Sequence, residues 1–130
     1  MLMEKKITIE ELYELLCKKF DAMPGLTELY VGITDDIVRR SEEHKEEYMF
    51  TQEIAHGTHA IISNAEKYLI KKFKELENIQ SIFKDKGKGG EGTSTADKLY
   101  ISYNYDTKKM KDINDLDDDD FDVTKYELTK

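Results

Sequence analysis

Residues 29 to 44 change from the period of a β-strand to the period of an α-helix, and no other part of the sequence constrains the fold as much. Leu29, Val31 and Ile33 alternate with polar or small residues, as one face of a strand requires. Arg40 and His44 then lie one helical turn apart. The sequence therefore predicts an α/β protein in which a strand leads directly into a helix over about residues 36 to 47.

That helix has a choice of N-cap residues and an acidic surface. Thr34, Asp35 or Asp36 can supply the cap. Four glutamates follow on the helix: Glu42, Glu43, Glu46 and Glu47. A solvated helix face is one interpretation of these glutamates, and a metal site is the other.

Two further helices are predicted from capping-box spacing and apolar periodicity. Thr8 and Glu11 have the capping-box spacing, and they precede an apolar stripe of Ile9, Leu12, Leu16 and Phe20. Ser63 and Glu66 have the same spacing. Their stripe extends to residue 77 and comprises Ile62, Ala65, Leu69, Phe73 and Leu76. In such a box Glu66 would fold back onto the backbone and complete the helix end.

Residues 98 to 105 alternate clearly enough to predict a second strand. We expect its core face to comprise Leu99, Ile101, Tyr103 and Tyr105. Tyr100 lies on the other face, where it either reaches a ligand or is half-exposed. A short strand is also predicted over residues 48 to 51.

Two polar segments invite ligand-binding interpretations. His56 and His59 have a spacing that can ligate zinc, but a structural zinc site needs four ligands, and a turn over residues 56 to 59 is the alternative. Residues 87 to 95 form a glycine-rich loop without the Walker spacing. Glycines let backbone amides converge on an anion, so the loop is either a surface connection or a phosphate site made by Lys88, Gly89, Gly90, Gly92, Thr93 and Ser94.

Length and charge predict a single domain with an acidic tail. The 130 residues suffice for one modest core. The net charge is −8, and seven aspartates between residues 112 and 122 carry almost all of it. The remaining residues are close to neutral, so charge gives no support to nucleic-acid binding. We divide the chain into an N-terminal helical extension (1–25), a central domain (26–105) and a tail (106–130). The tail is either solubilising or a decoy that binds a basic protein partner.

Composition also predicts where the protein resides. Cys17 is the single cysteine and cannot form an internal disulfide, which favours a reducing compartment. The start of the chain lacks the apolar segment of a signal peptide, and no apolar run approaches the roughly 20 residues that span a bilayer. We expect a cytoplasmic protein without a membrane partner, in a cell or in a virus-infected host cell. The apolar residues after the aspartate run, Phe121, Val123, Tyr126 and Leu128, would let the C-terminal end pack against the domain or against a second copy.

Several of these residues resemble the core motif of the GIY-YIG nuclease superfamily. In that family a tyrosine-apolar-glycine strand leads through a threonine into a helix that bears an arginine. The corresponding residues here are Tyr30, Val31 and Gly32, then Thr34 and Arg40, with His44 one turn further on. Residues 63 to 70 resemble the later helix that carries the family's metal-binding glutamate, which would be Glu66. The likeness covers about residues 28 to 105.

The resemblance implies a small GIY-YIG-like sheet flanked by helices and metal-dependent phosphodiester hydrolysis of nucleic acid. Glu66 would hold Mg²⁺ or Mn²⁺, which are hard cations that favour oxygen ligands. Arg40 would bind the phosphate. Tyr30 and His44 would position or deprotonate the attacking water.

The sequence departs from the family at one motif. The family's earlier glycine-apolar-tyrosine strand should lie about ten residues before Tyr30, but residues 20 to 25 contain no tyrosine. Tyr13 is the only tyrosine before Tyr30, and it lies in a predicted helix. The alternative function is therefore a catalytically inactive module that binds or sequesters a nucleotide or a partner protein.

Overall fold

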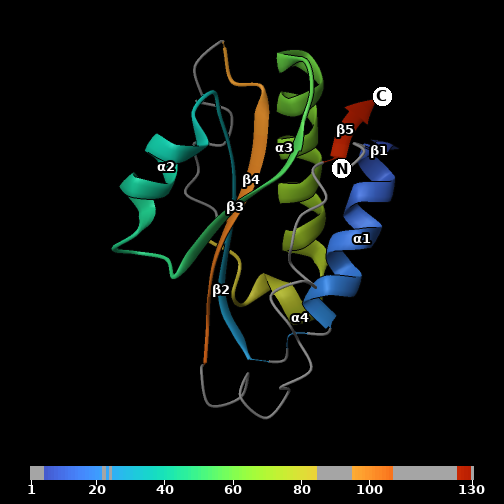
Figure 1. The fold of residues 1–130 in the computed structure, drawn as a ribbon. Helices are drawn as coiled ribbons and strands as arrows, with labels where there is room; N and C mark the ends of the chain where they lie inside the picture. Colours follow the sequence, from blue (N-terminus) through green and yellow to red (C-terminus); the bar gives the residue numbers. More distant parts are fainter. Residues whose placement is uncertain (1–4, 22, 24, 85–94, 107–125, 130) are drawn as a thin grey trace.

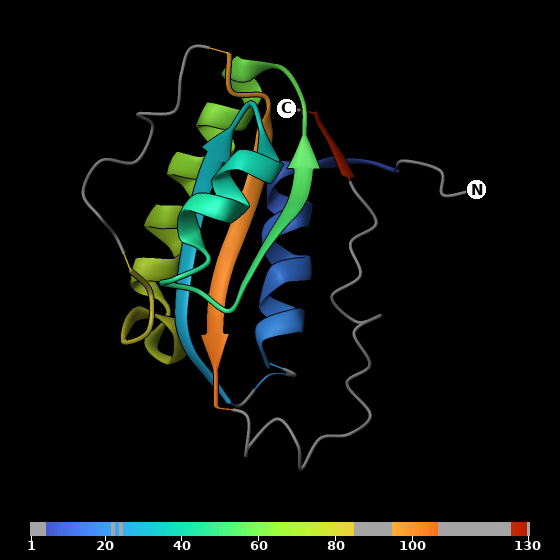
Figure 2. The same cartoon turned by 60° about the vertical axis from the view of Figure 1, so that its left-hand side comes forward.

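The protein is a five-stranded sheet with helices on both faces, which confirms the predicted α/β class (Figure 1). The computed structural model describes residues 5–21, 23, 25–84, 95–106 and 126–129. Two helices, α1 (Ile9–Asp21) and α3 (His59–Glu75), cover one face, and α2 (Ile37–His44) covers the other (Figures 1 and 2). Among the described residues, no helix combines the length and the apolar character needed to cross a membrane.

The sheet combines antiparallel and parallel pairs in the order β1-β5-β3-β4-β2. β4 (Lys98–Tyr105) runs antiparallel to both β2 (Leu26–Thr34) and β3 (Phe50–His56). β5 (Tyr126–Thr129) runs parallel to β3 and to β1 (Lys5–Thr8). A short helix, α4 (Glu77–Gln80), follows α3.

The first two helices begin as their capping residues predict. The backbone N–H of Thr8 donates to Glu11 Oε1 at 2.9 Å, and that of Glu11 donates to Thr8 Oγ1 at 3.1 Å, which confirms the first capping box. Asp36 caps α2, because its Oδ1 accepts from the N–H of Arg39 at 3.0 Å. α2 ends at His44, which is earlier than the predicted residue 47.

The predicted capping box at Ser63 is wrong. α3 begins at His59, and Thr58 is its N-cap, with the hydroxyl oxygen 3.3 Å from the N–H of Ile61. The earlier start adds one turn that buries Ile62 completely. Ser63 therefore lies inside the helix, and Glu66 is not completing a helix end.

The segment before α3 also differs from the prediction. β3 begins at residue 50 rather than 48 and continues to His56, so it is longer than the predicted strand. Only Gly57 and Thr58 separate it from α3. Nδ1 of His59 bonds to the backbone carbonyl of Ala96 at 2.8 Å, and this contact fixes the start of α3 against the segment that leads into β4.

β4 lies inside the sheet and is covered on both faces. Leu99 and Ile101 are completely buried on the predicted core side. On the other face Ser102 is completely buried and Tyr100 is only 1% exposed, so the prediction of a half-exposed Tyr100 is wrong. The cause is α2, which covers this face of the sheet (Figure 2).

Segments from both ends of the chain join the same sheet. β5 lies between β1 and β3, and Ile7 and Leu128 belong to the same hydrophobic core as Leu29 and Ile101. The aspartate run at residues 112 to 122 lies outside the described residues. So does the predicted phosphate loop, Lys88, Gly89, Gly90, Gly92, Thr93 and Ser94.

Candidate functional site

Tyr100 lies directly over Gly32 on the neighbouring strand. The antiparallel register of β2 and β4 places these two residues opposite each other. A Cβ atom added to Gly32 would lie 2.5 Å from Cζ of Tyr100 and 2.8 Å from its Cε1, and it would also meet the hydroxyl. Because Gly32 has no side chain, the Tyr100 ring can occupy the space above it.

Tyr100 belongs to an aromatic cluster that we call the tyrosine–histidine cluster, which comprises Tyr30, His44, Tyr48 and Tyr100. The His44 ring centroid lies 5.4 Å from that of Tyr30, 5.7 Å from Tyr48 and 5.8 Å from Tyr100. Tyr30 is also 6.0 Å from Tyr48 and 6.1 Å from Tyr100. Nε2 of His44 and the Tyr100 hydroxyl are hydrogen-bonded at 3.2 Å. Strands β2 and β4 and the C-terminal end of α2 thus converge on one polar contact.

Arg40 and Glu66 act electrostatically on the same hydroxyl. Burial raises the pKa of Tyr100, and the neighbouring phenol of Tyr30 raises it further. Arg40 lowers this pKa and Glu66 raises it. Charges from two different helices, Arg40 on α2 and Glu66 on α3, thus influence the pKa of the same hydroxyl.

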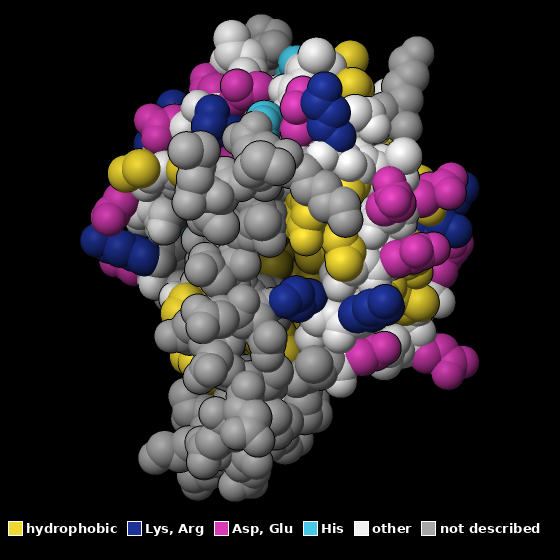
Figure 3. All heavy atoms as spheres, turned by 45° about the vertical axis from the view of Figure 1, so that its right-hand side comes forward, with side chains coloured by type: hydrophobic (Ala, Val, Ile, Leu, Met, Phe, Trp, Pro, Cys, Tyr) yellow, Lys and Arg dark blue, Asp and Glu magenta, His cyan; other side chains and the backbone are white. Residues whose placement is uncertain are grey.

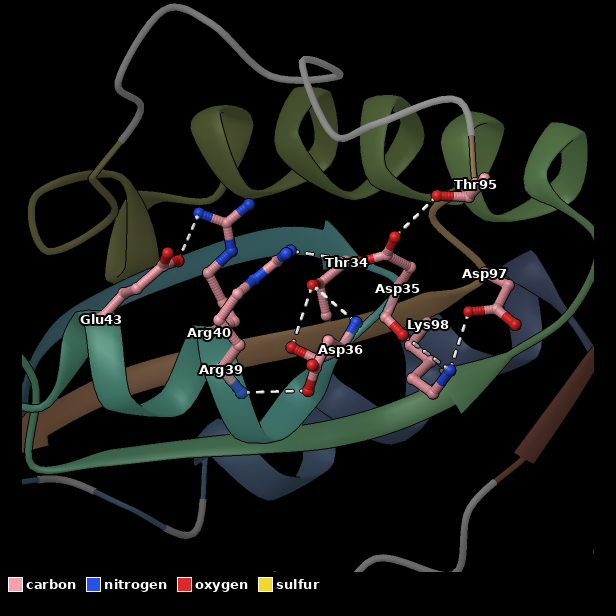
Figure 4. Close-up of polar contacts among 9 residues, drawn as sticks. All are labelled: Thr34, Asp35, Asp36, Arg39, Arg40, Glu43, Thr95, Asp97 and Lys98. Atoms are coloured by element: carbon pink, nitrogen blue, oxygen red, sulfur yellow. Dashed lines mark hydrogen bonds and ion pairs between the residues drawn. The ribbon is translucent and has the colours of Figure 1, made fainter.

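The two charged residues differ in their access to solvent. The Arg40 side chain is 31% exposed, and its Nη1 pairs with Glu43 Oε1 at 3.2 Å (Figure 4). Nε of Arg40 is buried and makes no hydrogen bond to any residue that the structure describes. Glu66 is only 2% exposed. The site thus combines an arginine with an unused donor and a deeply placed carboxylate.

The four residues selected from the sequence, Tyr30, Arg40, His44 and Glu66, accordingly contact Tyr100 or act electrostatically on it. The sequence pattern did not select Tyr48, although its ring belongs to the cluster. Burial raises the pKa of Tyr48, and its hydroxyl has no hydrogen-bond partner within the described residues. Alternation in residues 98 to 105 correctly gave the face of Tyr100, but it could not show which strand lies beside it.

A polar network at the start of α2 fixes that helix relative to β4 (Figure 4). Asp35 accepts from Thr95 Oγ1 at 2.7 Å and from Arg39 Nη2 at 3.1 Å. Nζ of Lys98 donates to the backbone carbonyl of Asp35 at 3.3 Å. Because α2 carries His44 and β4 carries Tyr100, these bonds hold the two halves of the cluster in register.

The turn between β2 and α2 is closed by Thr34. Its hydroxyl oxygen accepts from the N–H of Asp36 at 3.0 Å and donates to the carbonyl of the same residue at 3.2 Å (Figure 4). Thr34 is 1% exposed. The threonine of the predicted motif therefore has a structural function, which is to turn the chain from the strand into the helix.

The donor set limits the kind of metal that the site could hold. Within the described ranges, no group of three or more His, Cys, Asp or Glu residues is arranged to bind a metal ion. Zinc prefers three or four protein ligands, whereas Mg²⁺ keeps several waters and needs only one or two carboxylates together with substrate phosphates. The donor set therefore suits Mg²⁺ or Mn²⁺ held jointly with a substrate better than zinc, while the 2% exposure of Glu66 gives a cation little access to this carboxylate.

Comparison of the chain with protein-family models, characterised proteins and solved structures finds no match in any of the three.

Proposed function

We propose that this protein hydrolyses phosphodiester bonds in nucleic acid with the help of one divalent cation, Mg²⁺ or Mn²⁺. The observation that carries the proposal is the convergence on Tyr100. Tyr30 and His44 contact it, and Arg40 and Glu66 act on its hydroxyl. Those four residues were selected from the sequence by their resemblance to the GIY-YIG superfamily. The resemblance also implies a tyrosine on an earlier strand, and the antiparallel neighbour of β2 supplies a tyrosine, Tyr100, from later in the chain.

Arg40 is the group that would bind the scissile phosphate. Its ion pair with Glu43 involves a carboxylate that is 50% exposed, and pairs of this kind contribute about 0–1 kcal/mol. A phosphate can therefore replace Glu43 at little cost and use the buried Nε donor as well. A guanidinium that binds two phosphate oxygens also stabilises the charge that develops during hydrolysis.

The tyrosine–histidine cluster would handle the attacking water. Tyr100 keeps its proton at neutral pH, since the ordinary tyrosine pKa of about 10 is raised further by burial, so it can act as a hydrogen-bond donor that orients its neighbours. His44 shares a hydrogen bond with this hydroxyl. His44 and Tyr30 then position or deprotonate the water. Glu66 would hold the cation, and the cation would neutralise charge on the phosphate.

The proposal is tested by cleavage assays on DNA and RNA with Mg²⁺ or Mn²⁺. We expect Arg40→Ala and Glu66→Gln to lower the cleavage rate by about 100-fold or more. The matched controls are Lys45→Ala, an exposed basic residue at the C-terminal cap of α2, and Glu75→Gln, an exposed glutamate on α3. They should retain activity within a few-fold. Circular dichroism would verify that every variant is folded. Absence of cleavage by the unmodified protein on both polymers with both cations would refute the proposal.

Burial of Glu66 favours a second candidate, an inactive module that binds a nucleotide. A carboxylate that is 2% exposed is poorly placed to receive a hydrated cation, whereas Arg40 remains accessible. This function predicts a thermal shift with nucleotides in the absence of metal that disappears in Arg40→Ala. A flat response across mono-, di- and triphosphates would contradict it. Binding of a protein through the acidic tail, self-association and a cytoplasmic location remain predictions.

A further inference from the structure

The exposed residues of α3 carry a row of lysines. In this helix the exposed positions are Ala60, Asn64, Lys67, Lys71, Lys74 and Glu75. Lys67, Lys71 and Lys74 are spaced by four and three residues, so they lie on one face of the helix. At 1.5 Å per residue they extend over about 10 Å along the axis. We call these three residues the α3 lysine row.

The other helix on this side of the sheet has the opposite charge. The exposed residues of α1 are Glu10, Glu11, Glu14, Lys18 and Asp21. Figure 3 turns the α1 side forward and shows acidic and basic side chains mixed on that face. The positive charge on α3 is therefore a local feature and does not follow from the composition of the chain, whose net charge is −8.

Around the axis of α3, the α3 lysine row is displaced from Glu66 in the direction away from the contact with α1. In steps of about 100° per residue, Lys74, Lys67 and Lys71 lie about 80°, 100° and 140° from Glu66. Tyr68, which contacts α1 through the Tyr13 ring at 5.9 Å, lies about 160° from Glu66 in the other direction. α3 runs alongside β2, the edge strand that carries Gly32 and Tyr30 (Figure 4). A strand of nucleic acid could thus contact the row and reach the site across this edge.

At least two of these lysines are available to a ligand. Neither Lys67 nor Lys71 forms an ion pair or a hydrogen bond through its side chain with any residue that the structure describes. They are about 6 Å apart along the helix axis, which spans about two phosphates at 3.4 Å per nucleotide of each strand. Lysine ammonium groups bind phosphates as point charges and release counterions when they do so.

We infer that the α3 lysine row binds the phosphodiester backbone of the nucleic acid beside the phosphate held by Arg40. This inference rests on the proposed function and deepens it, because it identifies the substrate as a polymer and assigns the surface that recognises it. The row contributes affinity without base specificity, since ammonium–phosphate contacts do not read the sequence.

The test compares two double variants with the same change of charge. Lys67→Gln/Lys71→Gln removes two members of the row, and Lys18→Gln/Lys19→Gln removes two lysines from α1. Binding of a fluorescein-labelled single-stranded 20-mer is measured by anisotropy at several NaCl concentrations, without divalent metal. DNA and RNA forms of the same oligonucleotide distinguish the two kinds of backbone.

For a single strand, each phosphate contact adds about 0.7 to the slope that relates log affinity to log salt concentration. Loss of two contacts should therefore weaken binding by the α3 variant about 25-fold at ~0.1 M salt. The slope of log Kd against log salt should fall by about 1.4. The α1 variant should match the unmodified protein. Equal affinity of the α3 variant and the unmodified protein, or an equal loss in the α1 variant, would overturn the inference.

Hydrolysis of a small diester separates this inference from the proposed function. Bis(4-nitrophenyl) phosphate has no flanking backbone, so the α3 variant should hydrolyse it at the rate of the unmodified protein. If the unmodified protein binds the oligonucleotide through the row but cleaves no diester, the inference stands and the proposed hydrolysis fails. If it cleaves diesters and binding is unaffected in the α3 variant, only the inference fails.

Discussion

Replacing Gly32 by alanine tests the contact on which the candidate site depends. The new methyl carbon would lie 2.5 Å from Cζ of Tyr100, where ordinary contacts begin near 3.4 Å. The ring would have to move by roughly 1 Å, but it is 1% exposed and is bonded to His44. Overpacking of this kind costs about 1–3 kcal/mol. For a domain of this size, that corresponds to a fall in Tm of about 4–12 °C.

A double-mutant cycle shows whether Tyr100 is the cause. Tyr100→Val removes the ring atoms that the methyl group would meet, so Gly32→Ala should cost less than about 0.5 kcal/mol in that background. Gly57→Ala is the comparison, because its nearest neighbour would be the carbonyl oxygen of Leu128 at 3.2 Å, which requires a smaller adjustment. We expect it to cost less than Gly32→Ala does in the unmodified protein.

Urea denaturation followed by far-ultraviolet circular dichroism gives the required free energies of unfolding, since the chain has no tryptophan to report by fluorescence. The reasoning would be refuted if Gly32→Ala cost the same with and without the Tyr100 ring. A cost no greater than that of Gly57→Ala in the unmodified protein would refute it too. In either case Tyr100 would not lie over Gly32, and the convergence of the site residues would lose its centre.

Three further measurements test other features. Thr58→Ala should destabilise the protein by about 1 kcal/mol because Thr58 caps α3. Ser63→Ala should change stability by less than about 0.5 kcal/mol. If urea midpoints showed the reverse order, Ser63 and not Thr58 would be the N-cap. Tyr48→Phe removes a buried hydroxyl without a partner among the described residues, so it should be neutral or stabilising by up to about 1 kcal/mol, and a clear loss in thermal unfolding would contradict the geometry. Burial raises the pKa of Tyr100 above 10.0, so the unfolded chain loses this proton first, and stability should be intact below pH 10 and fall above it by about 1.4 kcal/mol per pH unit. Urea midpoints between about pH 9 and 11.5 should fall less steeply in Tyr100→Phe, and identical slopes would contradict the burial of this hydroxyl.

Local interactions explain why parts of the fold were predictable. Thr8 and Glu11 satisfy each other's backbone groups within one turn, and this interaction needs nothing from the rest of the chain. Alternation in residues 29–34 and 98–105 likewise identified β2 and β4, although β2 begins earlier, at Leu26. The start of α3 was wrong because Thr58 and Ser63 are both good caps. Burial of Ile62 in the core favours the earlier start, and the local pattern contains no information about that contact.

The candidate site was predictable only in part, for a related reason. The spacing of Arg40 and His44 on one helix is a local property and was read correctly. Tyr100 was not assigned to the site, because its position opposite Gly32 depends on the pairing of two strands far apart in the sequence. The burial of Glu66 likewise depends on the packing of α3 against the sheet.

The sequence by itself therefore determined the helices and strands that hydrogen bonds between near neighbours and side-chain periodicity can specify, and it selected four polar residues by their likeness to a known motif. Tertiary structure decided the strand order, the insertion of β5 between β1 and β3, and the convergence of those residues on Tyr100. The physical reason is that strand pairing satisfies backbone groups between segments that are distant in the chain. A periodic pattern records which face a side chain occupies, but it does not record the neighbour it will meet there.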